Sequence, residues 1–471
     1  MSYETRIGWR YLYRGEGDRS HLVGLVCFAL MTALGLALAL ISAGGSGWGI
    51  ILTGVGMMGS VLFGLLWVFS VFTTVSVLGV VLGVAAMTLV LAVTSGFQQQ
   101  FQDKVLGVNA HVIIMKNNQG FSEYRDIEKI AWESDKEQVI AVQPFIFVEM
   151  QVTRGMGYLS GVAIKGIDPK RMNSVLDVHK QMVEGTVETL QRSVDDENPA
   201  PIVIGQVLAE KLKAKVGSRV TVVVPPIRNV DTSSWESLAE STKSVEFEVT
   251  GIFYSGFAEY DQRLMYISLE AFQGLLDWGD KVMGVELKVR DVSKADEVAK
   301  KIDKVLVETY NDFQWSVQDW NALNKNLFTA LTLQKIALVI VLTLIIAVAT
   351  FNMVSALTMM VIDKTREIAI LRSMGSTSLG IGRVFQTVGL CIGGVGTVCG
   401  LVIGLTLCEL LQRYNYRLDP KVYLIDKLPV SVNFNEVIWV GVVTMIISGV
   451  ATWFPSVKAS KLQPVEGLRY D

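Results

Sequence analysis

Residues 22–102 contain no Asp, Glu, Lys, Arg or His, which is an uncharged run of 81 residues. A helix crosses the bilayer core with about 20 apolar residues, so this run has room for three crossings. The glycine-rich break at 43–49 separates a first span, at about 22–42, from a second at about 49–69. The third, at about 72–96, carries Gly79 and Gly83 at a spacing that lets membrane helices approach closely. A cleaved signal peptide is the alternative for the first span, although its apolar run exceeds a typical signal core.

Three further apolar spans follow, at 336–362, 384–408 and 437–457. The span at 336–362 has no charged residue or histidine over 27 residues. The whole chain is 51% hydrophobic and only 18% charged, with the apolar residues gathered in blocks. This composition predicts a membrane protein with six transmembrane helices. The net charge of −3 gives no reason to expect nucleic acid as a partner.

Basic residues indicate the orientation of these spans. Arg6, Arg10 and Arg14 are spaced by four, as in an amphipathic helix on the inner-leaflet surface. Further Lys and Arg residues follow the span at 336–362 and the last span. If the chain is followed through its six predicted crossings, all of these basic clusters lie on one face of the membrane. The positive-inside tendency identifies this face as cytoplasmic. We therefore expect both termini in the cytoplasm.

The large polar block between the third and fourth spans has the pattern of an α+β domain. Strand-like runs are at 111–115, 140–152, 161–167, 201–205, 219–224, 245–254, 263–269 and 285–290. Helical patterns lie between them, at 206–217 and 295–310. The block is long enough to bury a core of its own, and three crossings from a cytoplasmic N-terminus put it outside the cytoplasm.

A short charged helix is expected directly after the fourth span. Ile368, Leu371 and Met374 fall at i, i+3 and i+6, which we interpret as an apolar stripe over about two turns. Gly375 is expected to end the helix. Such a helix, joined to membrane spans, could transmit a push from a cytoplasmic partner; alternatively, it only lies on the headgroups.

The motifs of ATP hydrolysis or other catalysis are missing from the sequence. GSTSLG at 375–380 has glycines at Walker A spacing, but Ile381 and Gly382 stand where Lys and Ser or Thr are required, so it is interpreted as a helix cap and turn. The four cysteines lie in apolar spans without metal-ligand spacing, and the three histidines are scattered. We expect no catalytic residue, metal site or cofactor in this chain, so energy must come from a separate ATPase.

Five stretches of the chain have a recognisable sequence. They are LGVVLGVAAMTLVLAVTSGFQQQFQDKVLGVNAHVII, GIFYSGFAEYDQRLMYISLEAFQGLL, the run from LNKNLFTAL to AILRSMG at 323–375, VYLIDKLPV, and WFPSVKASKLQPVEGLRYD. These stretches resemble the lipoprotein-releasing ABC permeases, the C and E membrane subunits of the Lol complex, which belong to the mechanotransmission superfamily with the macrolide-efflux and FtsX permeases. Their order over about 400 residues makes a chance likeness very improbable. One departure is clear, because residues 22–71 look like an extra hairpin inserted before the family's first span.

Together with the extra N-terminal hairpin, the resemblance implies an α-helical membrane protein with six transmembrane helices rather than four, and a large extracytoplasmic α+β domain. The expected parts are a cytoplasmic amphipathic helix at 1–21, the extra hairpin at 22–71, a transmembrane helix at 72–96, a periplasmic α+β domain at 97–331, a transmembrane helix at 332–362, a cytoplasmic coupling helix at 363–383, a transmembrane helix at 384–411, a periplasmic loop at 412–434, a transmembrane helix at 435–457 and a cytoplasmic tail at 458–471.

The resemblance also implies a function and partners. The chain would sit in the bacterial inner membrane as one of two permease copies, identical or paralogous, on a LolD-like ATPase that binds ATP and Mg. It would take a triacylated lipoprotein from the membrane lipids and pass it to a LolA-like periplasmic carrier. Contact with the ATPase is expected at Arg366, Glu367, Ile368, Leu371, Arg372, Met374 and Gly375.

Two further sites are hypotheses. Acyl chains need an apolar cavity near the outer leaflet, for which the outer ends of the third and fourth spans offer Val90, Val93, Thr94, Phe97, Phe101, Leu327, Phe328 and Leu331; ordinary helix packing is the alternative for each residue. The polar segment at 225–243 resembles in position a loop that recruits the carrier, with Pro225, Pro226, Ile227 and Trp235 as candidates; an ordinary surface loop is the alternative.

Two other functions remain open. A permease of the cell-division type switches a wall hydrolase and moves no substrate, but typically has a smaller outer domain. A permease for efflux of small molecules or peptides is usually fused to its ATPase. A third, unrelated class, a membrane-anchored receptor, would not require a cytoplasmic coupling helix.

Overall fold

The chain folds into two compact units. The helical unit comprises residues 1–99, 330–417 and 427–471, and the sheet unit comprises residues 100–329 and 418–426. The computed structural model describes residues 3–12, 19–41, 47–117, 120–155, 158–192, 199–224, 243–310, 314–414, 418 and 427–462.

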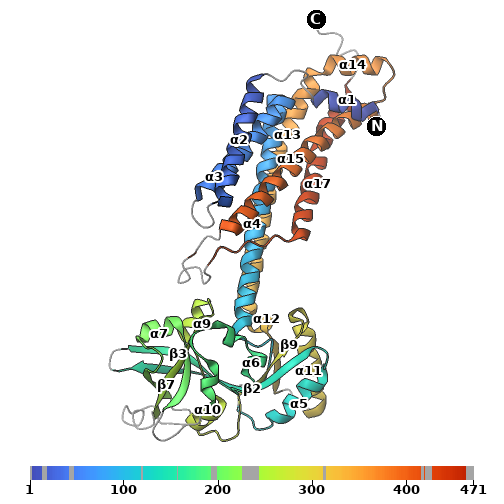
Figure 1. The fold of residues 1–471 in the computed structure, drawn as a ribbon. Coiled ribbons are helices and arrows are strands. Elements are labelled where there is room, and N and C mark those ends of the chain that lie inside the picture. The colour runs from blue at the N-terminus through green and yellow to red at the C-terminus, as the bar shows by residue number, and fades with distance from the viewer. Residues whose placement is uncertain are drawn as a thin grey trace, which may run out of the picture. The chain divides into compact units, whose positions relative to one another are not determined.

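The described part of the helical unit consists of long helices and two short ones (Figure 1). They are α1 (Tyr3–Leu12), α2 (Arg19–Ile41), α3 (Gly47–Val68), α4 (Val71–Val108), α13 (Lys325–Asp363), α14 (Thr365–Ser373), α15 (Ser378–Tyr414) and α17 (Phe434–Lys461). In the described part of the chain, six of them are long and apolar enough to cross a membrane, which confirms the predicted number.

Helices α4 and α13 are longer than a crossing requires. They have 38 and 39 residues, or almost 60 Å each, against a hydrocarbon core of about 30 Å. Within the bilayer-length part they pack closely, as the glycine spacing predicted. A Cβ added at Gly79 would lie 3.1 Å from the Cβ of Ala349, and one at Gly83 would lie 2.9 Å from Ile346.

Helices α2 and α3 form the extra N-terminal hairpin. A Cβ at Gly59 would lie 2.1 Å from the ring of Phe28, and one at Gly56 would lie 2.7 Å from the backbone nitrogen of Thr32. Leu65 and Phe69 are buried in a cluster with Ile403 of α15. The hairpin is therefore packed onto the helices that follow it in the chain.

The described residues of the sheet unit form one mixed sheet of ten strands, which Figure 1 shows as arrows. The strands are β1 (Val112–Lys116), β2 (Val139–Arg154), β3 (Tyr158–Ile167), β4 (Met182–Gly185), β5 (Ala200–Gly205), β6 (Arg219–Val224), β7 (Lys243–Phe253), β8 (Leu264–Ser268), β9 (Gly284–Val289) and β10 (Trp315–Asp319). Their order is β10-β1-β9-β2-β3-β8-β5-β7-β4, and β6 pairs with β2 and β7. The pairs β3–β8 and β5–β7 are parallel.

Each of the eight predicted strands coincides with an observed one, whereas β4 and β10 were not predicted. Both are short, at four and five residues, and carry polar residues or glycine, so their alternation is weak. The helix expected at 206–217 is wrong in length, because α7 (Gln206–Leu212) ends where Lys213 turns left-handed at φ 51°. The helix expected at 295–310 is α11 (Ala295–Tyr310).

Helices cover the sheet and divide its core into two clusters. The helices are α5 (Tyr124–Ser134), α6 (Met172–Val175), α7, α9 (Ala258–Arg263), α10 (Leu269–Leu276), α11, α12 (Trp320–Leu323), and the 3₁₀ turns η1 (Val178–Gln181), η2 (Val187–Gln191) and η3 (Val292–Lys294). Ile202 and Ile204 belong to the larger cluster, which includes residues of α5, α7, α10 and α11, whereas Val203 between them belongs to the cluster of α6 and η2. Alternate residues of β5 thus bury both faces of the sheet.

A fully buried ion pair lies inside this sheet. The Nζ of Lys165 on β3 donates to Oε2 of Glu286 on β9 at 2.7 Å, and their side chains are 5% and 0% exposed. The Nε2 of Gln143 on β2 donates to Oε1 of Glu286 at 2.7 Å. Three strands are therefore joined by side chains whose charges balance within the core.

Lys165→Met should destabilise the sheet unit by about 3–5 kcal/mol, because it leaves the Glu286 carboxylate buried without a cation. The measurement is backbone hydrogen exchange of β3 and β9 in the full-length protein in detergent. Adding Glu286→Gln should recover most of the protection. Lys243→Met, which removes an exposed pair with Asp277, is the control and should cost less than about 1 kcal/mol. Unchanged exchange in Lys165→Met would contradict the assignment.

Candidate functional site

Helix α14 follows α13 directly, with Lys364 alone between them. It ends at Ser373, and Gly375 adopts φ +101°, a conformation that favours glycine. The amide of Ser376 donates to the carbonyl of Leu371 at 3.0 Å, which closes the last turn. Both the expected helix and its expected end are therefore present.

One side of α14 is buried against the helical unit. Ile368 and Ala369 are 1% and 3% exposed. Ile368 packs in a cluster with Val361 of α13, Ile381 and Phe385 of α15, and Ala459 of α17. The start of α14 is thus packed against three of the long helices.

Arg372 holds the C-terminal end of α14 in place by hydrogen bonds. Its Nη2 donates to Oγ of Ser378, the first residue of α15, at 2.9 Å. Its Nη1 donates to the carbonyl oxygens of Ser460 and Leu462 at the end of α17. Arg372 was predicted as a contact for the ATPase, whereas these bonds give it an internal role in positioning α14.

The opposite side of α14 is open. Arg366 and Glu367 are exposed, and Glu367 pairs with Lys364 at 2.6 Å. Met374 is 79% exposed and Ile370 is 45% exposed, and Leu379 on the first turn of α15 is 75% exposed. Ile370 and Leu379 were not singled out from the sequence. The signal that could have identified them is an apolar residue next to the charged residues of a short helix.

The predicted apolar stripe of Ile368, Leu371 and Met374 is wrong as a single face. Ile368 is buried, Leu371 is half-buried and Met374 is exposed. Residues i and i+6 lie about 120° apart around a helix, so they cannot both face the same neighbour. Met374 also lies beyond the last helical residue.

Helix α1 belongs to the same end of the helical unit. A Cβ at Gly8 would lie 2.8 Å from Oγ1 of Thr387 on α15, so the two helices are in close contact. The centroids of the Tyr11 and Phe385 rings are 6.0 Å apart. The Nζ of Lys364 lies 5.6 Å from the centroid of the Tyr11 ring. Burial and the nearby Glu367 carboxylate raise the pKa of Tyr11 to about 12, so its hydroxyl stays neutral beside α14.

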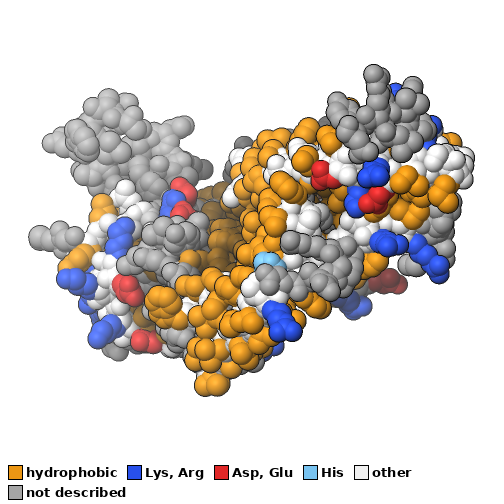
Figure 2. Space-filling view, turned by 90° about the horizontal axis from the view of Figure 1, so that it is seen from above, with side chains coloured by type: hydrophobic (Ala, Val, Ile, Leu, Met, Phe, Trp, Pro, Cys, Tyr) orange, Lys and Arg blue, Asp and Glu red, His pale blue; other side chains and the backbone are white. Residues whose placement is uncertain are grey.

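Basic side chains are spread around the end of the helical unit that carries α14, while hydrophobic side chains cover its flanks (Figure 2). The basic residues are Arg6, Arg10, Arg19, Lys364, Arg366, Arg372, Arg383, Lys458 and Lys461. The acidic residues of these segments are fewer, namely Glu4, Asp363 and Glu367.

The eight residues expected to line a cavity are divided between the two units. Val90, Val93, Thr94, Phe97 and Leu331 lie in the helical unit, and Phe101, Leu327 and Phe328 lie in the sheet unit. All are half-buried except Phe101, which is 7% exposed.

Several of these eight residues already have neighbours within their own unit. Val90 and Val93 pack against buried clusters of the bundle. Phe101 meets Phe257 edge-on at 5.9 Å, and Phe328 meets Trp320 edge-on at 5.2 Å. The predicted carrier-docking residues Pro225, Pro226, Ile227 and Trp235 lie outside the described residues.

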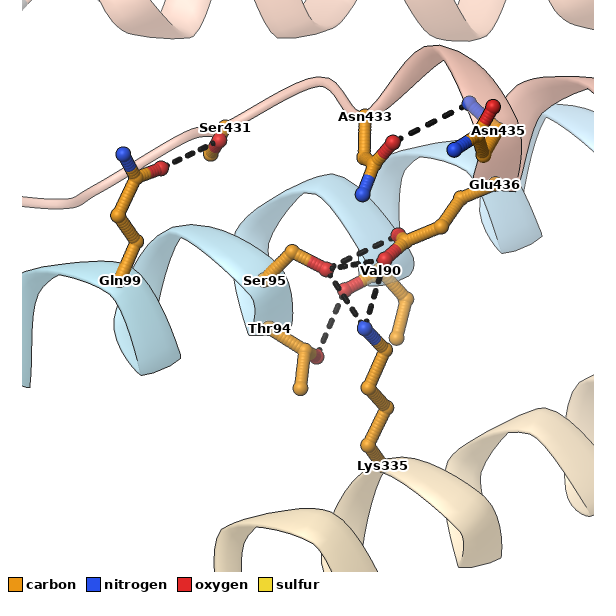
Figure 3. Close-up of polar contacts among 9 residues, drawn as sticks. All are labelled: Val90, Thr94, Ser95, Gln99, Lys335, Ser431, Asn433, Asn435 and Glu436. Atoms are coloured by element: carbon orange, nitrogen blue, oxygen red, sulfur yellow. Dashed lines mark hydrogen bonds and ion pairs between the residues drawn. The ribbon is translucent and has the colours of Figure 1, made fainter. Parts of the chain in front are cut away.

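A polar cluster that the sequence did not reveal joins three helices beside Val90 and Thr94 (Figure 3). Nζ of Lys335 on α13 lies 2.7 Å from Oε1 of Glu436 on α17 and 2.9 Å from Oγ of Ser95 on α4. Oγ of Ser95 lies 2.9 Å from both carboxylate oxygens. Lys335 and Glu436 stand at the borders of apolar spans, where they look like ordinary flanking charges.

The segment before α17 is held against α4 at the same level. A Cβ at Gly96 would lie 2.5 Å from the carbonyl oxygen of Pro429, so glycine is needed there. The amide of Ser431 donates to the carbonyl of Ala92 at 2.9 Å, and its hydroxyl to Oε1 of Gln99 at 2.8 Å (Figure 3). Helices α4, α13 and α17 are therefore tied together at this level by polar contacts.

Lys335→Met should lower the stability of the helical unit by roughly 1–2 kcal/mol, between the values for exposed and buried pairs, because Glu436 keeps its charge without a cation. The measurement is the thermal unfolding midpoint of the detergent-solubilised protein. The double variant Lys335→Met with Glu436→Gln should recover most of the loss. Arg413→Met, which removes an exposed pair within α15, is the matched control. Equal effects of Lys335→Met and Arg413→Met would contradict the role of the cluster.

Two family models match the chain. Residues 73–305 match the MacB-like periplasmic core domain, and residues 339–464 match the FtsX-like permease C-terminal model. The first match begins after the α2–α3 hairpin.

Curated relatives match over most of their length. The chain is 32% identical to the lipoprotein-releasing system transmembrane protein LolC of Neisseria meningitidis, over 85% of this chain and 95% of that protein. It is 27% identical to the lipoprotein-releasing system transmembrane protein LolE of Haemophilus influenzae, over 83% and 93%. Among solved structures, the periplasmic region of MacB from Actinobacillus actinomycetemcomitans is 13% identical, covering 49% of this chain and 98% of that one at a TM-score of 0.29.

The described residues contain six apolar helices, and the periplasmic-core match covers the sheet unit from residue 100 to residue 305. The match to LolC extends over nearly the whole length of that protein. These findings agree with the resemblance seen in the sequence. The chain is a multi-pass membrane protein with a periplasmic domain, and it belongs to the LolC/LolE family of lipoprotein-releasing ABC transporter permeases.

Proposed function

We propose that this chain is the membrane subunit of an ABC transporter that extracts lipoproteins from the bacterial inner membrane and passes them to a LolA-like periplasmic carrier. A separate LolD-like ATPase binds ATP and Mg and hydrolyses the ATP. The observation that carries the proposal is α14, a short helix fixed to three long helices on one side and open on the other, in a chain of this family.

The orientation follows from charge. The basic residues at the α14 end of the helical unit favour the cytoplasmic face, since Lys and Arg concentrate there in membrane proteins. Both termini, with α1 and the end of α17, are then cytoplasmic. The α2–α3 hairpin adds two crossings and leaves this orientation unchanged.

Motion of the ATPase reaches the membrane through α14. Ile370, Met374 and Leu379 offer an exposed apolar surface flanked by Arg366 and Glu367, as expected for a docking site with a hydrophobic centre and a polar rim. Ile368 and Arg372 connect that surface to α13, α15 and α17. A force applied at Met374 is therefore transmitted to the long helices and is not lost in a flexible loop.

The substrate path lies between two permease copies, identical or paralogous. A triacylated lipoprotein enters from the outer leaflet, where Val90, Val93, Phe97 and Leu331 of the helical unit offer apolar surface. Phe101, Leu327 and Phe328, of the same predicted set, belong to the sheet unit. Closure of the ATPases then moves the acyl chains out of the membrane towards the carrier.

Met374→Asp should abolish ATP-dependent release, because it places a charge at the centre of the ATPase contact. The assay uses proteoliposomes with the purified ATPase, a fluorescent triacylated lipoprotein and a soluble carrier. The unaltered complex should transfer the lipoprotein to the carrier with ATP and not with a non-hydrolysable analogue.

Trp132→Asp is the matched control, since it places the same charge on an exposed aromatic residue of the sheet unit. It should leave ATPase binding intact. Export of a small dye in place of the lipoprotein would contradict the proposed substrate and favour efflux. Full release by Met374→Asp would contradict the coupling role of α14.

Residues 225–242 connect β6 to β7, and we propose that they dock the carrier. Val224 and Lys243 are paired in the antiparallel ladder, so deleting 228–242 leaves three residues to close a hairpin, which is an ordinary length. The deletion should abolish pull-down of the carrier while ATPase activity of the complex is unchanged. Unchanged pull-down would contradict the assignment.

A further inference from the structure

Two long helices, α4 and α13, each continue without a break from the helical unit into the sheet unit. The division between the units falls between residues 99 and 100 in α4 and between residues 329 and 330 in α13. A helix transmits movement to the sheet unit only if its end is fixed there. The attachment of these two ends is therefore what decides which helix can carry movement.

The end of α4 is packed into the sheet unit. Phe101 is 7% exposed, and Val105 and Val108 are 0% exposed. Val108 belongs to the buried cluster that includes residues of α6 and η2. Just beyond the helix, Nδ2 of Asn109 donates to the hydroxyl oxygen of Tyr260 on α9 at 2.6 Å. Apolar burial and a polar contact together hold this end of α4.

The start of α13 is attached less closely. Residues 325–329 are all exposed or half-buried. The Phe328 ring meets that of Trp320 on α12, the short helix that directly precedes α13. The amide of Trp320 donates in turn to the carbonyl oxygen of His111 at 2.9 Å. Of the two helices, α4 is thus the one whose end is buried in the sheet unit.

Residues 255–257, between β7 and α9, contact one side of α4. The Phe257 ring meets the Phe101 ring edge-on, with the centroids 5.9 Å apart. Nζ of Lys104 donates to the carbonyl oxygen of Ser255 at 2.8 Å. Positions 101 and 104 are three apart, so both side chains lie on one face of the helix. The 255–257 loop therefore holds that face through an aromatic and a charged contact.

The side chain of Asp261 on α9 fixes the shape of this loop. Its Oδ1 accepts hydrogen bonds from the amide and the hydroxyl of Ser255, both at 2.8 Å. Its Oδ2 accepts one from the amide of Gly256 at 3.1 Å, and Gly256 adopts φ +69°. Asp261 is 0% exposed. A carboxylate is costly to bury unless its oxygens are hydrogen-bonded, and these three donors all belong to the loop.

The electrostatics of Asp261 connect it to α4. Burial raises the pKa of its carboxyl, while the hydrogen bonds from Ser255 and Gly256 and the positive charge of Lys104 oppose that rise. Lys104 thus acts on the loop twice, through its hydrogen bond to Ser255 and through its attraction to the carboxylate that holds Ser255.

Helix α9 is itself pressed against the end of β5. A Cβ at Gly205 would lie 2.4 Å from the carbonyl oxygen of Asp261, so no side chain fits between the two elements. Strand β5 is an inner strand of the sheet, and all six of its residues are buried. The contacts therefore run from α4 through the 255–257 loop and Asp261 to the inside of the sheet.

We propose that Asp261 and Lys104 are positioning residues for lipoprotein release: they fix the 255–257 loop on α4, so that α4 carries movement of the membrane helices into the sheet unit. The inference deepens the proposed function and rests on it in one respect, namely that ATP-driven movement of the helices causes release. It adds the residues through which this movement enters the periplasmic domain, and it gives α13 the lesser part.

Hydrogen exchange of the full-length protein in detergent tests the attachment without ATPase or lipoprotein. Lys104→Met should speed amide exchange of residues 255–257 about threefold or more, because the loop loses a charged hydrogen-bond donor. Asp261→Asn should speed it roughly tenfold or more, because the loop loses the carboxylate that accepts three of its hydrogen bonds. Lys325→Met at the exposed start of α13 is the matched control and should leave this exchange unchanged.

A second control separates Asp261 from its own helix. Glu259→Gln removes an exposed carboxylate of α9 that accepts a hydrogen bond from Arg263 at 3.1 Å. It should leave exchange of the 255–257 loop unchanged. Exchange of β5 should also be unchanged in Lys104→Met, which leaves the buried carboxylate in place. Lys104→Met therefore decides the test even if Asp261→Asn unfolds the sheet unit.

Transport by the complete complex tests the role of the attachment. In proteoliposomes with the ATPase, a fluorescent lipoprotein and the carrier, Lys104→Met should hydrolyse ATP at the unaltered rate but release roughly threefold fewer lipoproteins per ATP, or fewer still. Lys104→Arg keeps a charged donor and should restore the unaltered ratio. Lys325→Met should also keep that ratio. A purely structural role would not change the number of lipoproteins released per ATP.

Unchanged release per ATP in Lys104→Met would overturn the inference. So would equal losses in Lys104→Met and Lys325→Met, or unchanged exchange of the 255–257 loop in both Lys104→Met and Asp261→Asn. Failure of the proposed function has a different result, because the unaltered complex would then release no lipoprotein to the carrier.

Discussion

The attachment of α14 to the ends of the long helices is the constraint on which the rest of the molecule depends. Ile368 is packed among α13, α15 and α17, and Arg372 donates hydrogen bonds to the start of α15 and the end of α17. Helix α1 adds a further contact through Gly8 and Tyr11. A short helix held in this way moves with the membrane helices, so a force applied to its open side is transmitted to them.

Polar groups organise the membrane part beyond this joint. Away from α14, Lys335 of α13, Glu436 of α17 and Ser95 of α4 satisfy one another. Between these two levels, Nε2 of Gln386 on α15 donates to the carbonyl oxygen of Gly449 on α17 at 2.9 Å. Because unsatisfied polar groups are costly in lipid, such contacts mark where helices are fixed to one another.

Much of the fold could be predicted from the sequence, because membrane spans and alternating strands leave strong local patterns. Among the described residues, the six spans and eight of the ten strands followed from such patterns. The buried pair of Lys165 and Glu286 could not be predicted, because β3 and β9 are covered on both faces and alternation no longer separates inside from outside.

The site was harder to predict than the fold. The sequence predicted the position of α14 and its end at Gly375. It did not predict that the Arg372 side chain points inward, because an arginine on a short helix looks like a surface charge. The partnership of Lys335 with Glu436 joins residues 101 positions apart, which no local pattern encodes. Family resemblance supplied the expected roles, whereas the direction of each side chain required the structure.

The central claim is that a cytoplasmic ATPase grips α14. The most direct measurement places a photo-reactive amino acid at position 374, and a second one at Leu159 in the sheet unit as reference, in cells that produce the whole complex. Irradiation should join position 374 to the ATPase and position 159 to no cytoplasmic protein. An adduct of position 374 with a periplasmic protein would contradict the account. So would the absence of an ATPase adduct from both positions.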